Sequence, residues 1–420
     1  MISREQLVAA LADRWDEIAA ALGAERARVE HALLPLLRAL ELAGDGGARQ
    51  VAVAAVLALL QDCAPAYQAL LSALREAVPA KGAAGPAGYV AKARWTQFPV
   101  FFGTDRASIG RNDGWADFGA EGGELTLGMA EVSVPDDARL GDLEAASWWK
   151  LEFRTDPAQH FIVHGLRLLA RTEFVATARR LLDSTSKQDV LVFLHGYNTA
   201  FADALQTTAQ LAYDLQFEGV AALYSWPSEA ALAGYSADEK KVRASQSRFV
   251  EFIELLRGEL AAKAVHVVAH SMGGQLLLAA LKEWSSQGPM AAPELAEVVF
   301  AAPDVDAQEF KDCAAASSDL VSRLTLYASS TDRALQASRL RHRRPRAGET
   351  GVDLVVASTV DTIDASEVDT SLLGHAYYAE NRSLIGDLFY LIRYRMPPQH
   401  RFGLQPKDRY GQRYWAFRRS

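Results

Sequence analysis

The pentapeptide Ala269-His-Ser-Met-Gly273 combines the residue types that nucleophilic catalysis needs with a suitable position in the chain. It directly follows an apolar run and directly precedes a helical pattern at 274–284. A serine on a tight strand-to-helix turn points its hydroxyl out of the sheet, toward the helix N-terminus and the next N–H. The turn is crowded, so the residues two before and two after the serine must be small. We expect Ser271 to be a nucleophile; the alternative is a serine that only caps a helix.

A second turn carries groups that suit an oxyanion hole. His195-Gly-Tyr-Asn198 follows the apolar run 190–194, two strand–helix units before the serine. A glycine lets the backbone turn sharply, so that the N–H of Tyr197 points at the substrate of the nucleophile. Paired with the N–H of Met272, it would bind the oxyanion. The alternative is an ordinary turn at the end of a strand.

A serine hydroxyl is a weak nucleophile and needs a base, which in turn needs an orienting acid. Where the nucleophilic serine lies on a strand-to-helix turn of a parallel sheet, the catalytic residues follow one another in the chain as Ser, then Asp or Glu, then His. Three histidines follow the last predicted strand: His342, His375 and His400. His342 lies among arginines, whose positive charge disfavours a catalytic base, and His400 lies in a basic tail. We therefore expect His375 to be the base, with a structural role as the alternative.

The acid has two candidate positions. Asp332 follows the predicted strand 324–328 and begins a helix, so its alternative role is that of a helix cap. Asp304 and Asp306 follow the preceding strand and are the rival acids. We favour Asp332 and keep Asp304 as the competitor.

Other segments of the sequence allow alternative interpretations of their role. Trp226, in Tyr224-Ser-Trp-Pro-Ser228, either lines an acyl pocket or belongs to the core. The polar segment 229–241 is a candidate cap over the site. The aromatic and basic tail after Leu388 either binds anionic lipid or nucleic acid, or packs its rings on the domain, which we favour.

The elements that must position these residues form a regular alternation. Apolar runs typical of buried strands alternate with amphipathic helices, which predicts a mostly parallel sheet with helices on both faces. In such sheets the functional groups lie at the carboxyl ends of the strands. The predicted strands are 98–102, 124–134, 190–194, 220–224, 264–269, 297–301 and 324–328, and the predicted helices are 174–182, 200–216, 237–262, 274–284 and 307–316.

The chain of 420 residues has room for two or three domains. Residues 1–80 show helical periodicity throughout and predict a small all-helical domain. Residues 81–94, rich in Gly, Ala and Pro at their start, predict a linker, and 95–420 the catalytic domain. The helices are candidates for docking a protein partner, for oligomerisation, or for capping the catalytic domain.

Composition excludes several classes of protein. Half of the residues are hydrophobic and 23% are charged, which is ordinary for a globular protein. The formal net charge of −8 does not favour nucleic-acid binding. Two cysteines far apart argue against a disulfide framework, and no signal peptide or membrane-length apolar run is evident, so we expect a cytoplasmic protein without a transmembrane segment.

The motifs together resemble an uncharacterised bacterial family of α/β-hydrolases, classed only as a domain of unknown function. The resemblance covers residues from about 95 to 420, and in that family an alanine before the His-Ser pair is usual. It implies the α/β-hydrolase fold and a serine triad, and it leaves the substrate open. The matching runs are Phe101–Arg106, Phe193–Asn198, Tyr224–Ser228, Ala269–Gly273, Ala302–Asp306, Ser330–Ala334 and Gly374–Tyr378.

These observations predict a serine hydrolase that cleaves a small-molecule or lipid carboxylic ester through an acyl-serine intermediate. The predicted triad is Ser271, His375 and Asp332, and neither a metal nor an organic cofactor is needed. The alternative is a partner-regulated, lipase-like effector, or a non-catalytic interaction protein on a hydrolase scaffold. Acyl length, and the choice among ester, thioester and amide, stay open because the same triad serves all of them.

Overall fold

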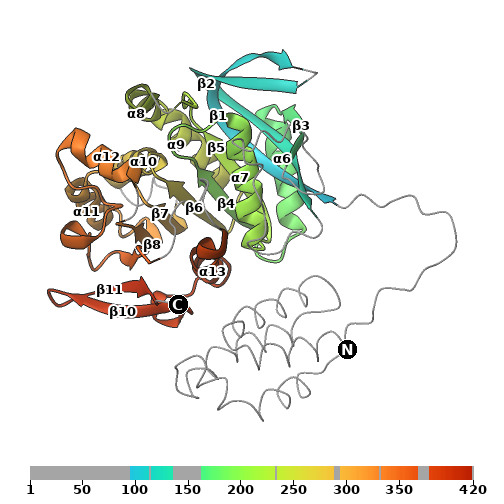
Figure 1. Cartoon of the computed structure of the whole chain (residues 1–420). Helices are drawn as coiled ribbons and strands as arrows, with labels where there is room; N and C mark the ends of the chain where they lie inside the picture. The colour runs from blue at the N-terminus through green and yellow to red at the C-terminus, as the bar shows by residue number, and fades with distance from the viewer. Residues whose placement is uncertain are drawn as a thin grey trace, which may run out of the picture. The chain divides into compact units, whose positions relative to one another are not determined.

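The computed structural model of the chain describes residues 95–112, 115–135, 162–231, 234–287, 294–330, 333–367 and 378–418 (Figure 1). All of these belong to one compact unit that begins at Ala93. The predicted helical domain 1–80 and the linker 81–94 lie outside the described residues.

A sheet of eleven strands runs through the described region, in the order β10-β11-β9-β8-β7-β6-β4-β5-β1-β2-β3. The neighbours from β1 through β5, β4, β6, β7, β8 and β9 to β11 pair in parallel, whereas β1-β2, β2-β3 and β10-β11 are antiparallel. The strands are β1 Trp95–Asn112, β2 Trp115–Pro135, β3 Ile162–Leu168, β4 Asp189–Leu194, β5 Gly219–Ser225, β6 Ala264–His270, β7 Leu295–Ala301, β8 Val321–Ala328, β9 Asp361–Asp364, β10 Leu404–Arg409 and β11 Gln412–Phe417.

Helices cover both faces of the sheet (Figure 1). Side chains alternate along the central strand β4: Val190, Val192 and Leu194 join one buried cluster, and Leu191 and Phe193 join the other. This alternation follows from the two-residue period of a strand, and it explains why the central strands are apolar throughout.

Each buried cluster is completed by its own set of helices. The first packs against α6, α9, α10 and α11, and the second against α7 and α13. The helices are α6 Arg171–Asp183, α7 Phe201–Asp214, α8 Tyr235–Ala244, α9 Gln246–Glu254, α10 Gly273–Gln287, α11 Ala307–Ala316, α12 Arg333–His342 and α13 Tyr378–Tyr394, with short helical turns η3 Leu255–Glu259, η4 Gly351–Asp353 and η5 Pro398–His400.

The predicted alternation of strands and helices from 174 to 328 is confirmed, with one difference. The single helix expected over 237–262 is three pieces, α8, α9 and the π-helical turn η3. The first break lies at Ser245, whose hydroxyl donates to the carbonyl of Lys241 at 3.0 Å. A serine that bonds back to the preceding turn bends a helix, and hydrophobic periodicity does not register this effect.

Candidate active site

Ser271 lies on a sharp turn between β6 and α10, at the carboxyl edge of the sheet. Its φ is +50°, a left-handed conformation that non-glycine residues adopt only where the surroundings hold them there. The N–H of Ser271 donates to Ala301 O at 3.0 Å, and its carbonyl accepts from the N–H groups of Gly274 at 3.0 Å and Asp304 at 3.1 Å. Backbone bonds to the neighbouring loop after β7 thus hold the turn, and the residue is 9% exposed.

Two glycines allow the turns after β4 and β6 to meet. A Cβ on Gly273 would lie 2.6 Å from the carbonyl oxygen of His195, which is closer than real contacts allow. A Cβ on Gly196 would lie 3.2 Å from Cβ of Ser271. The expected need for a small residue at 273 is therefore confirmed. In the turn after β4, however, the left-handed φ lies at Asn198 (+55°), so Gly196 favours the close approach of the two turns and is not needed for the turn itself.

The proposed oxyanion donors lie on these two turns. Among the described residues, no acceptor receives the N–H of Met272, while its side chain is fully buried in the core. Tyr197 is half-buried, and its ring packs edge-on against that of Tyr235, with 5.6 Å between the ring centroids. Gly196 brings the peptide before Tyr197 next to Ser271, so the turns are adjacent as an oxyanion hole requires.

Trp226 lies beneath this edge and does not reach the surface. Its side chain is fully buried, and its ring stacks on that of His195 at 4.9 Å between centroids. Its indole N–H donates to the carbonyl of His195 at 3.0 Å. These contacts favour the interpretation in which Trp226 belongs to the core, where it supports the loop that carries Tyr197.

Asp304, the rival acid, is committed to a buried network. One carboxylate oxygen accepts from Arg346 Nε at 2.7 Å and from the hydroxyl of Ser338 at 2.5 Å. The other accepts from the hydroxyl of Tyr235 at 2.5 Å. Burial and the neighbouring carboxylate raise the pKa of Tyr235 above its usual value, so this phenol stays a donor. The ion pair with Arg346, both partners buried, gives Asp304 a structural role.

Asp306, the third candidate, caps α11. Its carboxylate accepts from the N–H groups of Gln308 at 2.9 Å and Glu309 at 3.0 Å. This is the ordinary use of an aspartate at a helix start.

Asp332 and His375 lie outside the described residues. The strands before them are described, however, and both end at the edge that carries Ser271. Asp332 follows β8, which pairs in parallel with β7, and His375 follows β9, the next strand beyond it. The segments that follow β8 and β9 therefore both start at the carboxyl edge of the sheet, where the functional groups of parallel sheets lie.

The segment expected to cap the site contributes α8. Asp238 is fully buried and accepts from the N–H groups of Asn198 at 3.1 Å and Glu229 at 2.7 Å, and from the hydroxyl of Ser228 at 2.7 Å. One carboxylate thereby joins α8 to the loops after β4 and β5. Tyr235 adds contacts to Tyr197 and Asp304, so α8 is fastened to three loops of the sheet edge.

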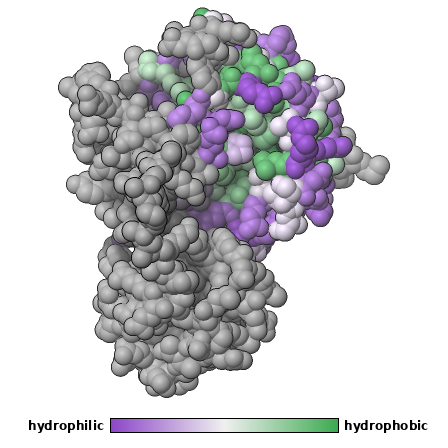
Figure 2. Space-filling view, turned by 90° about the vertical axis from the view of Figure 1, so that its right-hand side faces the viewer, coloured by the Kyte–Doolittle hydropathy of each residue, from purple (hydrophilic) through white to green (hydrophobic). Residues whose placement is uncertain are grey.

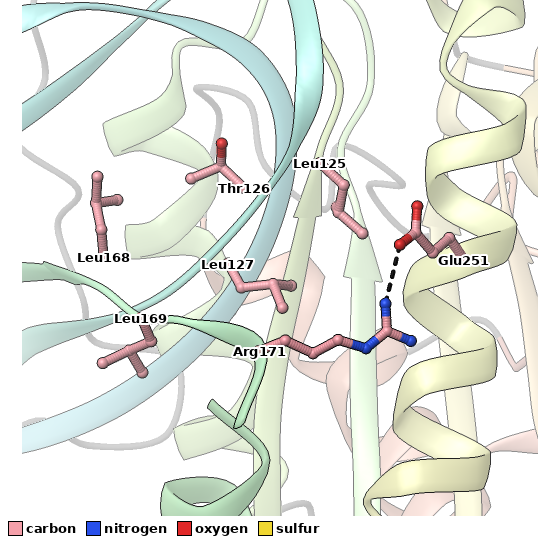
Figure 3. A pocket seen from close by; sticks show the side chains of 7 residues that line it. All are labelled: Leu125, Thr126, Leu127, Leu168, Leu169, Arg171 and Glu251. Carbon is pink, nitrogen blue, oxygen red and sulfur yellow. Dashed lines mark hydrogen bonds and ion pairs between the residues drawn. The ribbon is translucent and has the colours of Figure 1, made fainter. Parts of the chain in front are cut away.

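A surface hollow of about 380 Å³ lies elsewhere, between β2, the end of β3 and α9 (Figure 3). An ion pair between Arg171 and Glu251, 3.0 Å long and half exposed, spans one side of it. Its lining contains no residue of the turns around Ser271. Figure 2 shows that the described part of one face mixes hydrophobic and hydrophilic side chains, which is ordinary for a protein surface. Neither feature supplies catalytic groups.

The parallel sheet covered on both faces, with a left-handed serine on the turn between a central strand and its helix, defines an α/β-hydrolase. A family model described as alpha/beta hydrolase of unknown function (DUF900) matches residues 170–395, more than half of the chain, so the chain belongs to that family. The predicted resemblance is thereby confirmed. No curated protein and no solved structure showed significant similarity.

Two further features of the described residues bear on partners. No helix within the described ranges is both long and apolar enough to cross a bilayer. In the same ranges, no group of three or more His, Cys, Asp or Glu is arranged to hold a metal ion.

Proposed function

We propose that this protein is a serine hydrolase that cleaves carboxylic esters through an acyl-serine formed on Ser271. The observation that carries the proposal is the left-handed backbone of Ser271 at the carboxyl edge of the sheet, next to Gly196 and Tyr197. A strained conformation costs about 1–3 kcal/mol and tends to be kept at functional sites. A serine that merely capped a helix would have extended φ and ψ.

In this mechanism, Ser271 Oγ attacks the ester carbonyl while His375 takes its proton. The N–H groups of Met272 and Tyr197 bind the oxyanion of the tetrahedral intermediate. His375 then protonates the leaving alcohol, and water hydrolyses the acyl-serine by the same route in reverse. Asp332 holds the imidazole in the correct tautomer and stabilises the imidazolium. The commitment of Asp304 to Arg346 supports Asp332 as the acid.

A short-chain acyl ester is the substrate class that we propose. The surface hollow of about 380 Å³ has no residue of the turns around Ser271 in its lining, and the sequence shows no large apolar lid over the site. A fully buried Trp226 also leaves that ring unable to line an acyl pocket in this conformation. Esters of graded acyl length would locate the preferred chain length directly.

A fluorophosphonate probe tests the proposal. The wild type should be labelled at Ser271, and Ser271→Ala should lose the label together with ester turnover, by about 10⁴-fold or more, while it stays folded. Ser286→Ala is the matched control, because Ser286 is an exposed serine on the same helix, α10. Labelling at another serine, or full turnover by Ser271→Ala, would contradict the assignment.

A further inference from the structure

Arg106, from one of the motifs without an assigned role, lies buried behind the proposed oxyanion hole. Its side chain donates to the carbonyl of Thr199 at 2.8 Å, to the carbonyl of Ser228 at 3.0 Å and to that of Gly119 at 3.2 Å. Its Nε donates to the hydroxyl of Ser225 at 2.9 Å. One planar guanidinium therefore joins β2 to the loops after β4 and β5. Burial lowers the pKa of Arg106 to about 10, so it remains a cation at neutral pH.

The hydroxyl of Ser225 also forms a hydrogen bond with His195. Ser225 Oγ lies 3.0 Å from His195 Nε2, and His195 Nδ1 lies 2.8 Å from the carbonyl oxygen of Gly196. A carbonyl oxygen only accepts, so Nδ1 carries the proton. Burial lowers the pKa of His195 to about 3, so the ring is neutral and its Nε2 is an acceptor. Ser225 therefore donates to Nε2 while it accepts from Arg106.

The hydrogen bond from His195 Nδ1 to the carbonyl of Gly196 fixes the peptide group between Gly196 and Tyr197, which carries the proposed oxyanion donor. The carbonyl of Gly196 and the N–H of Tyr197 belong to one planar peptide and point in opposite directions. A hydrogen bond that fixes the carbonyl therefore also fixes the N–H, and it polarises that N–H as a donor. Trp226, stacked on the imidazole, prevents the ring from turning away.

We propose that Arg106, Ser225 and His195 are positioning residues, which hold the Gly196–Tyr197 peptide so that the Tyr197 N–H points into the oxyanion hole. The inference rests on the proposed function, since it assigns a role to the oxyanion donor of that reaction. None of the three side chains touches the substrate. Their effect is on transition-state binding, where a displacement of about 1 Å in a donor costs on the order of a hundredfold in rate.

The first test removes the central hydroxyl. Ser225→Ala should lower kcat, and the rate at which a fluorophosphonate labels Ser271, by about tenfold to a hundredfold, with KM changed less than about twofold. Arg106→Lys, which keeps the buried charge but loses the planar fork, should shift both rates in the same direction. Ser317→Ala is the control for lost stability, because Ser317 is equally buried and its hydroxyl donates to the carbonyl of Cys313 at the C-terminal end of α11. It should leave both rates unchanged.

The second test reads the histidine itself and needs no turnover. In the full-length protein labelled with ¹⁵N-histidine, His195 should be protonated on Nδ1 alone at neutral pH. Ser225→Ala should move its Nε2 resonance toward that of an unbound ring nitrogen. A proton on Nε2 in the wild type would overturn the proposal, because a bare Nδ1 cannot bind the carbonyl of Gly196.

The outcomes separate the two proposals. If the wild type is labelled at Ser271 and Ser225→Ala is labelled equally fast, the positioning role is wrong and the serine hydrolase stands. If the wild type is not labelled at Ser271, the proposed function fails and the positioning role fails with it. If Ser225→Ala and Ser317→Ala both lower kcat and the labelling rate, the cause is a loss of stability, and this result would also overturn the proposal.

Discussion

The carbonyl oxygen of His195 occupies the space that a side chain at Gly273 would need: the distance to a Cβ built there is 2.6 Å. The backbone of the loop after β4 thus lies directly against the first turn of α10. A side chain at 273 could be accommodated only if the loop or the helix moved, because the carbonyl of His195 belongs to the backbone.

Gly273→Ala should therefore damage both the fold and the site. We expect a loss of about 1–3 kcal/mol in the free energy of unfolding, as for overpacked cores, and loss of fluorophosphonate labelling at Ser271. Gly258→Ala is the control, since a Cβ there meets nothing within 4 Å. Chemical denaturation and labelling would measure the two effects. A Gly273→Ala variant of wild-type stability and activity would show that the two turns are less tightly joined than the structure indicates.

The two candidate acids should fail in different ways. Asp332→Asn should lose turnover with little change in stability, because the asparagine favours the wrong imidazole tautomer. Asp304→Asn should instead lower the free energy of unfolding by about 3–5 kcal/mol, since it leaves the buried Arg346 without its counter-charge. Thermal unfolding and kcat, measured on both variants, distinguish the two roles. Greater loss of turnover in folded Asp304→Asn than in Asp332→Asn would move the triad acid to the loop after β7.

Asp214 should make stability depend on pH. Burial raises its pKa to about 7 from an ordinary 3.8, and one carboxyl oxygen has no hydrogen-bond partner. The folded protein therefore holds a proton that the unfolded chain has released, so this residue contributes less stability as pH rises from about 4 to 7. Asp214→Asn, which does not titrate, should gain stability relative to the wild type over that range and keep a constant advantage above it.

Melting temperatures of wild type and Asp214→Asn between pH 4 and 8 check this prediction. Asp183→Asn, an exposed aspartate at the end of α6, is the control. A difference between wild type and Asp214→Asn that does not change with pH would show that Asp214 is ionised in the folded protein.

The region after Ala93 should be a sufficient hydrolase. Every described element belongs to the compact unit Ala93–Ser420, and so do all the proposed catalytic residues. We expect limited proteolysis near Lys81, Lys92 or Arg94 to release a fragment that keeps ester hydrolysis. A fragment that unfolds, or that is inert toward esters which the whole chain cleaves, would show that the first 92 residues are part of the hydrolase.

Local pattern was enough to predict the centre of this fold. The strands from β4 to β8 were placed within about three residues, because a buried parallel strand is a short apolar run and its helices repeat every 3.6 residues. The same pattern marked Ser271 as a candidate, but only the structure gave the left-handed φ of +50° that distinguishes it from a helix cap. Strands β3, β9, β10 and β11 were not predicted: they are short or lie near the edges of the sheet, where polar residues break the alternation.

The environment of the site depended on tertiary structure. Asp304 and Asp332 have similar positions after neighbouring strands, and only the fold brings Arg346 to Asp304, 42 residues away. Likewise, the sequence marked Arg106 as part of a motif but could not connect it with Ser225, 119 residues further on. Hydrogen bonds between such distant residues follow from how strands are ordered in the sheet, and strand order leaves no periodic signal in the sequence. Local pattern was therefore enough to predict Ser271 as the nucleophile, whereas the partners of Arg106 were decided by the packing of β1, β5 and β4 side by side.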